Sequence, residues 1–166
     1  MDTRSFTRMC AALSRACLML AVAGLIAVIA CVQWQVFGRY VMNDTPTWAE
    51  ALAMLLVLFV TAFGLAVGVR DAGHIGLESM VALLPAPWQR RIERLIHLLV
   101  GLFGGFMAWG GWQWASAKWG EKKPMLPVPD GIDYVPLVIA GVLIVLFSIE
   151  HLIANLQGTV VEPAWN

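Results

Sequence analysis

Charged residues are scarce in this chain of 166 residues, because Asp, Glu, Lys and Arg together make up only 13% of it. A soluble domain usually has about 25%. The eleven basic residues balance the eleven acidic ones, so the chain lacks the basic field of a nucleic-acid-binding protein. Hydrophobic residues make up 60%, which excludes a disordered chain and most soluble enzymes. We therefore expect one membrane domain, residues 1–166, with membrane lipid as its solvent and no nucleic acid as a partner.

Cysteine and catalytic motifs are scarce as well. Cys10, Cys17 and Cys31 all lie in or just before the first apolar run. An odd number without metal-ligand spacing predicts neither a disulfide framework nor a metal site. The sequence has no P-loop, nucleophile elbow or zinc-protease motif, so we assign no catalytic residue and expect no enzyme and no cofactor.

A haem-carrying redox subunit is one alternative for a small membrane protein with histidines. Haem would need axial ligands at matching depth inside a helical bundle. His74 falls in a connection, whereas His97 and His151 fall towards the ends of apolar runs. The sequence therefore provides no central histidine pair.

Long hydrophobic runs dominate the rest of the chain. A bilayer core of about 30 Å needs roughly 20 mainly apolar residues in a helix. Four runs fit this length, at about 16–38, 48–69, 92–117 and 134–153. The first run is too long for a signal peptide and is followed by no small-residue cleavage site, so we expect it to remain as a helix. The sequence predicts an all-α integral membrane protein with four transmembrane helices.

The orientation of these helices follows from Lys and Arg, which are enriched in cytoplasmic segments. Seven fall before the first span or between the second and third: Arg4, Arg8, Arg15, Arg70, Arg90, Arg91 and Arg94. Four fall in the other two connections: Arg39, Lys118, Lys122 and Lys123. This imbalance predicts a multi-pass protein with both termini in the cytoplasm.

The first connection is short and predicts an antiparallel hairpin of the first two helices. Thr47 and Glu50 have the spacing of a capping box, and Trp48 between them suits the membrane interface. Glu50 is thus expected as a cap residue, with Arg39 as a pairing partner across the hairpin. The functional alternative for Glu50 is an ion or proton site.

The second connection contains a short amphipathic pattern. Four apolar residues follow helical spacing, namely Leu77, Met80, Val81 and Leu84, before Pro85 and Pro87. This pattern predicts a short helix that lies along the cytoplasmic interface or against a partner protein. The third connection, 119–133, is rich in proline, so we expect it to be extended and not helical.

Two glycine pairs, Gly64 with Gly68 and Gly101 with Gly105, have the spacing of close helix–helix contacts. No span carries a charge near its midpoint, and the bundle interior is expected to be almost uncharged. A transporter that acts alone usually has a midplane site with ionisable groups or broken helices. The sequence therefore favours an accessory subunit, and the alternative is a small self-assembling proton-coupled transporter that uses Glu50.

The connections also carry a family pattern. In order along the chain, it runs through Arg39-Tyr40-Val41-Met42-Asn43, Trp48-Ala49-Glu50, Gly64, Arg70, His74-Ile75, Leu83-Leu84-Pro85 and Pro127-Val128-Pro129, followed by Tyr134 and Pro136. This arrangement resembles the small membrane subunit, the DctQ type, of tripartite ATP-independent periplasmic (TRAP) transporters. In that family a second Glu often follows the first one after the Trp, whereas here Ala51 follows Glu50.

The resemblance implies a complex in the bacterial inner membrane. A periplasmic substrate-binding protein would deliver an organic acid, such as a dicarboxylate, to a large membrane subunit driven by a sodium gradient. The small subunit would enlarge the static scaffold of that complex. Substrate and sodium sites would lie on other chains, so the resemblance suggests only structural or interface roles for Arg39, Trp48, Glu50, Arg70 and His74.

Overall fold

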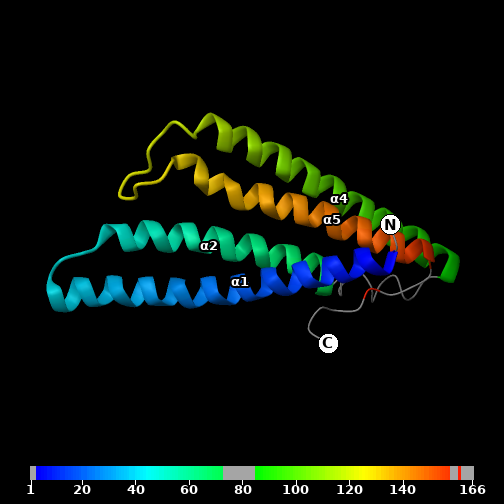
Figure 1. The fold of residues 1–166 in the computed structure, drawn as a ribbon, viewed down its shortest axis with the longest axis horizontal. Coiled ribbons are helices and arrows are strands. Elements are labelled where there is room, and N and C mark those ends of the chain that lie inside the picture. Colours follow the sequence, from blue (N-terminus) through cyan, green and yellow to red (C-terminus); the bar gives the residue numbers. More distant parts are fainter. Residues whose placement is uncertain (1–2, 73–84, 158–160, 162–166) are drawn as a thin grey trace.

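The computed structural model describes residues 3–72, 85–157 and 161, and within them the chain is helical (Figure 1). The elements, in chain order, are α1 (Thr3–Phe37), the π-helical turn η1 (Gly38–Met42), α2 (Thr47–Val67), the π-helical turn η2 (Gly68–Ala72), α4 (Ala86–Ala117), the 3₁₀ turn η3 (Asp130–Tyr134) and α5 (Val135–Gln157). Four of the helical segments are long and apolar enough to cross a membrane. The predicted all-α fold with four transmembrane helices is therefore confirmed.

The helices form two antiparallel hairpins, α1 with α2 and α4 with α5 (Figure 1). The hairpins contact each other mainly through α2, η2 and α5. Figure 1 shows them converging at one end, here called the Arg70 end, and separating towards the other. That other end holds connections 43–46 and 118–129 and is called the hairpin end. Helices suit this setting because they satisfy their backbone hydrogen bonds internally, as lipid requires.

The helix bounds differ from those of the apolar runs. α1 already begins at Thr3, well before the apolar run at 16, and α4 begins at Ala86. The early part of α1 is polar on one side, yet Cys10 and Ser14 in it are fully buried against the bundle. A run of apolar residues marks only the part of a helix that lies in lipid. The amphipathic start of α1 is not such a run, so the hydrophobic pattern does not predict it.

Glycines bring α4 and α5 into backbone contact. A Cβ at Gly104 would lie 2.8 Å from Ile144 Cγ2 and 2.9 Å from the Gly141 carbonyl oxygen. A Cβ at Gly141 would meet the Gly104 carbonyl oxygen at 2.5 Å. No side chain fits at either position, so the two helices approach more closely than larger residues would allow.

The glycine pairs expected from spacing are only partly used within this chain. Gly101 packs on Ser148, with a Cβ position 3.2 Å from that residue's Cβ. Gly64, Gly68 and Gly105 have no atom within 4 Å of a Cβ position. These three glycines make no close contact within this chain, so the helix contacts that their spacing allows stay a prediction.

The turn between α1 and α2 ends at Asn43, whose left-handed backbone (φ 54°) closes η1. Thr47 is the first residue of α2, and Pro46 stands at the cap position without a side-chain cap hydrogen bond. The Ala49 N–H donates to the Pro46 carbonyl at 3.0 Å. The predicted capping box with Thr47 as the cap residue is therefore wrong, since the proline takes that place.

The connection 118–129 is folded back on itself and is not simply extended. Lys122 and Pro129 form an antiparallel bridge, and a 3₁₀ turn follows at Asp130. That turn packs so closely on α4 that a Cβ at Gly131 would collide with the Ala115 carbonyl oxygen. The expectation of a wholly non-helical connection is thus wrong, because the prolines precede the turn and glycine allows it.

Ion pairs hold this connection in place. Lys118 Nζ lies 3.2 Å from Asp130 Oδ2 and 3.3 Å from Glu121 Oε2, and Lys123 pairs with Asp133. The hydrogen bond to Asp130, followed by the one to Glu121, raises the pKa of Lys118 above its usual range.

The predicted amphipathic helix, with Leu77, Met80, Val81 and Leu84, lies outside the described residues, as does His74. It stays a prediction.

Candidate functional site

The five residues suggested by the family pattern do not form one site. Arg39, Trp48 and Glu50 lie at the hairpin end, and all three are exposed. Glu50 Oε2 accepts a hydrogen bond from Gln35 Nε2 at 3.3 Å. The partner of Glu50 across the hairpin is therefore Gln35 and not Arg39, which corrects the pairing expected from the sequence. Arg70 lies at the opposite end of the bundle and is only 2% exposed.

Arg70 is the centre of a buried polar cluster. Its Nε donates to Glu150 Oε2 at 2.9 Å, and its Nη2 donates to Glu150 Oε1 at 3.0 Å. This two-pronged geometry is the strong form of a guanidinium–carboxylate pair. Arg70 Nη1 also donates to Asp71 Oδ1 at 2.5 Å. One guanidinium thus binds carboxylates from η2 and from α5.

The second carboxylate extends the cluster to α1. The Ser14 hydroxyl donates to Asp71 Oδ2 at 2.6 Å, and Ser14 itself is fully buried. Cys10, one helical turn earlier, is also fully buried. Residues from α1, η2 and α5 therefore meet at this one point.

Arg70 and Asp71 are consecutive residues of the π-helical turn η2, and both are buried, at 2% and 9% exposure. Such π-helical turns are frequent at functional sites.

Two histidines border the cluster. His151 Nε2 lies 2.9 Å from the Arg70 carbonyl oxygen, and because a carbonyl only accepts, this nitrogen carries the proton. The rings of His151 and His97 stack, with centroids 4.6 Å apart and planes 6° from parallel. A haem between them would need its ring in that space, so this pair is not arranged as axial ligands.

The electrostatics of the cluster are those of a structural clamp. Removing two charges from water is costly, and the cost is offset only when geometry and further hydrogen bonds satisfy both groups. Both Glu150 oxygens and both Asp71 oxygens have donors here. The Arg70 guanidinium also lies 5.9 Å from the centre of the Phe147 ring. Every oxygen of the two carboxylates thus has a donor within the cluster, and this arrangement links α1, η2 and α5.

Among the described residues there is no group of three or more His, Cys, Asp or Glu side chains placed to hold a metal ion.

The polar contacts continue from the cluster towards α4 through a second, more exposed set. Asn155 accepts from Arg94 Nε at 2.8 Å and donates to Glu93 at 2.7 Å. These bonds join α4 to the end of α5.

Reasoning from the sequence identified Arg70 but missed Glu150, Asp71 and Ser14. The expectation of an almost uncharged interior is wrong at the Arg70 end. A signal was present: Glu150 interrupts an apolar run, and Arg70 ends another run that reaches the same side of the membrane. Opposite charges at matching depth on two spans indicate a buried pair.

Most of the chain matches a known protein family. The family described as tripartite ATP-independent periplasmic transporters, DctQ component, matches residues 28–158. The matched range holds α2, α4, α5 and most of the cluster, whereas Cys10 and Ser14 precede it.

The individual relatives share about a quarter to a third of their residues with this chain over the aligned segments. The sialic acid TRAP transporter small permease protein SiaQ of Vibrio cholerae is 23% identical over 126 residues, 76% of this chain and 73% of that protein. The C4-dicarboxylate TRAP transporter small permease protein DctQ of Pseudomonas aeruginosa is 32% identical over 79 residues, 48% and 38% of the two chains. The sialic acid TRAP transporter permease protein SiaT of Haemophilus influenzae is 29% identical over 75 residues, 45% of this chain and 12% of that longer protein.

Proposed function

Because the chain belongs to the DctQ component family of TRAP transporters, we propose that it is the scaffold of a sodium-coupled importer of an organic acid. It is a small permease subunit and a transporter component, not an enzyme. In the proposed complex, a periplasmic substrate-binding protein delivers the acid to a large membrane subunit. That subunit moves the acid, and this chain, folded as a single membrane domain, supports it.

The family match over residues 28–158 is the observation that carries this proposal. The structure supports the passive role of the chain, because the buried carboxylates at the Arg70 end are hydrogen-bonded inside the bundle. A group that moves ions or protons needs an oxygen atom that a passing cation can reach. The side chains of Glu150 and Asp71 are only 1% exposed in this chain.

The relatives support a partnership with a large membrane subunit and a carboxylic acid as the substrate. One relative is named for a C4-dicarboxylate and two for sialic acid, and both substrate classes are carboxylic acids. A segment of this chain also matches part of SiaT, a longer permease protein. A match inside a larger chain is what we expect if the small and large subunits work side by side.

We propose that the protein lies in the bacterial inner membrane with both termini in the cytoplasm. Two observations support this proposal: four helices are long and apolar enough to cross a membrane, and seven of the eleven basic residues fall in segments on the side of the N-terminus. The Arg70 end would then face the cytoplasm, and the hairpin end would face the periplasmic binding protein.

Co-purification tests the partnership. The full-length chain, tagged at one terminus and extracted from its own membranes in mild detergent, should retain a membrane protein with many more spans in fixed stoichiometry. The control is an unrelated four-helix membrane protein carrying the same tag. Recovery of the chain alone or as a homo-oligomer, under several mild detergents, would overturn the proposal.

A further inference from the structure

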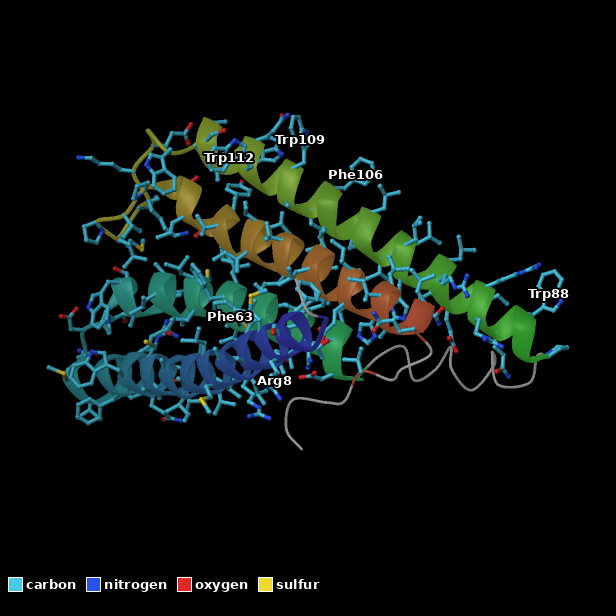
Figure 2. The ribbon with its side chains drawn as sticks, turned by 45° about the vertical axis from the view of Figure 1, so that its right-hand side comes forward. Arg8, Phe63, Trp88, Phe106, Trp109 and Trp112 are labelled. Atoms are coloured by element: carbon cyan, nitrogen blue, oxygen red, sulfur yellow. The ribbon has the colours of Figure 1, made fainter. Side chains whose placement is uncertain are left out.

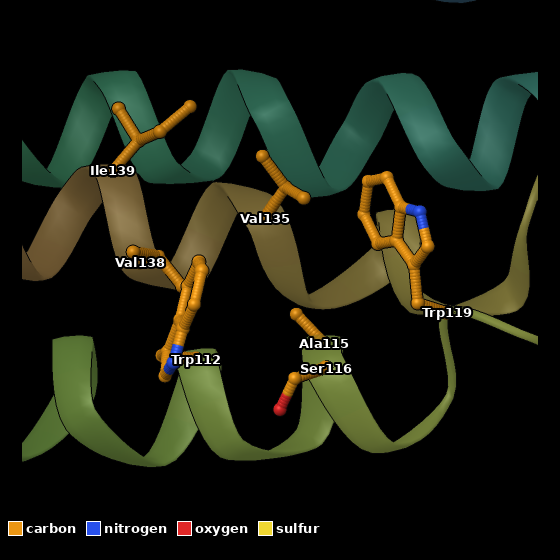
Figure 3. A pocket seen from close by; sticks show the side chains of 7 residues that line it. All are labelled: Trp112, Ala115, Ser116, Trp119, Val135, Val138 and Ile139. Atoms are coloured by element: carbon orange, nitrogen blue, oxygen red, sulfur yellow. The ribbon is translucent and has the colours of Figure 1, made fainter.

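A pocket opens at the hairpin end, away from the Arg70 cluster, and Figure 3 shows it from close by. The pocket has a volume of about 460 Å³. Trp112 and Trp119 border it from α4 and the connection after it, and Val135, Val138 and Ile139 form its floor on α5. The lining is almost wholly apolar, so an apolar occupant is favoured.

The position of the pocket is that of the membrane interface. Trp112 is five residues before the end of α4, which corresponds to a depth of about 7.5 Å at the helical rise. Trp119 lies just beyond that helix end. Tryptophans gather where acyl chains meet headgroups, and here two of them flank one pocket at that level.

The size of the pocket limits what can fill it. One turn of a helix with its side chains has a diameter of about 10 Å and a length of 5.4 Å, hence a volume of roughly 420 Å³. The pocket could hold only about one such turn. Below it the α4–α5 contact is closed, because Gly111 packs against Val138 with a Cβ position 2.9 Å from its Cγ2. The pocket is therefore too small to enclose a helix of a partner subunit, whereas a single slender chain fits inside it.

The charges of the adjoining connection add a second observation. Lys118 pairs with Glu121 and Asp130, and Lys123 pairs with Asp133. Lys122, three residues beyond Trp119, is exposed and has no acidic partner in the described part of the chain. A lysine at this level attracts an anionic headgroup.

From these observations we propose that the pocket between Trp112 and Trp119 binds one acyl chain of a phospholipid whose anionic headgroup lies near Lys122. This inference goes beyond the proposed transport role and does not depend on it. The lipid would thereby support the α4–α5 hairpin at the end where η3 begins.

A photoactivatable phospholipid tests the proposal. Membranes that contain the full-length chain are doped with phosphatidylglycerol whose acyl chain carries a diazirine near the headgroup. After illumination, the labelled residues are mapped by mass spectrometry. Labelling concentrated on residues 112–119 and 135–139 supports the proposal. Labelling spread evenly over the exposed apolar residues of all four helices overturns it.

Two tryptophan variants provide a matched pair. Ser116 lines the pocket and is exposed, whereas Gln113, on the same helix, is exposed and does not line it. Ser116→Trp should fill the pocket and abolish the concentrated labelling, and Gln113→Trp should leave the labelling unchanged. Equal labelling in both variants would contradict a built site.

Lys122→Gln tests the headgroup. The wild-type chain should favour labelled phosphatidylglycerol over labelled phosphatidylcholine by about fivefold, which is the effect of one lysine at a membrane surface. The variant should lose this preference and keep the labelled positions. An unchanged preference would overturn the assignment of the headgroup. Cross-linking of a Ser116→Cys variant to a second protein would overturn the proposal that a lipid fills the pocket.

Discussion

Arg70 is the residue at which the packing of three helices meets. Its guanidinium binds Glu150 through two hydrogen bonds and Asp71 through a third, and Asp71 in turn accepts from Ser14. Each of these groups would be costly inside the bundle alone, and each has a hydrogen-bonding partner within the cluster. The stability of the Arg70 end therefore depends on the completeness of the cluster and not on any single pair.

Removal of the guanidinium should destabilise the protein strongly. Arg70→Met leaves Glu150 and Asp71 buried without their cation, and breaking a buried ion pair in this way costs about 3–5 kcal/mol. We expect a large fall in the melting temperature of the detergent-solubilised protein, measured by thermal denaturation.

The matched control for this variant is Arg90→Met, which removes an exposed arginine on α4 and should change the melting temperature little. A double variant, Arg70→Met with Glu150→Leu, should recover part of the loss because one buried carboxylate is then gone. Equal melting of the two single variants would show that the cluster is not a clamp.

Glu50 should behave in the opposite way. Its side chain is exposed at the first turn of α2 and accepts one hydrogen bond of 3.3 Å from Gln35. An exposed interaction of this kind contributes within about 0.5 kcal/mol. Glu50→Gln should leave the melting temperature nearly unchanged and should preserve uptake by the assembled transporter. Loss of uptake with intact assembly would favour a proton-coupled role for this carboxylate.

At the scale of the helices, the α4–α5 hairpin depends on small residues. Gly104 and Gly141 lie in backbone contact, whereas Gly105, the next residue along α4, has open space around it (Figure 2 shows Phe106 and Trp109 on this outward side). Two adjacent glycines thus have different environments, which makes them a natural comparison.

Gly104→Ala should weaken the hairpin, because its Cβ would lie 2.8 Å from Ile144 Cγ2 and 2.9 Å from the Gly141 carbonyl oxygen. Overpacking of this kind costs about 1–3 kcal/mol. Gly105→Ala adds the same methyl group in open space and should be tolerated. Thermal melts of the two variants in detergent measure the difference, and equal destabilisation would contradict the described packing.

The sequence predicts the four long helices well, because an apolar run of about 20 residues has few other structures available in lipid. It predicts less where a helix leaves lipid. The polar start of α1 and the 3₁₀ turn at Asp130 depend on tertiary contacts, namely the burial of Ser14 and the close approach of Gly131 to Ala115. The cluster around Arg70 was missed for the same reason, since composition does not show which charges meet.

At the scale of the whole molecule, two hairpins are joined by a polar clamp at one end and separate towards the other (Figure 1). Outward glycines at 64, 68 and 105 leave close-approach points that this chain does not use itself. Such a molecule is well suited to support a larger membrane partner, and the proposed scaffold role requires no ion site of its own.

Substrate uptake into liposomes tests this account most directly. The purified chain is reconstituted alone, and in parallel with its large membrane subunit and the periplasmic binding protein, under an inward sodium gradient with a labelled organic acid. We predict uptake only in the complete system and none above empty liposomes for this chain alone. Sodium-driven uptake by this chain by itself would contradict the central claim that it is a scaffold.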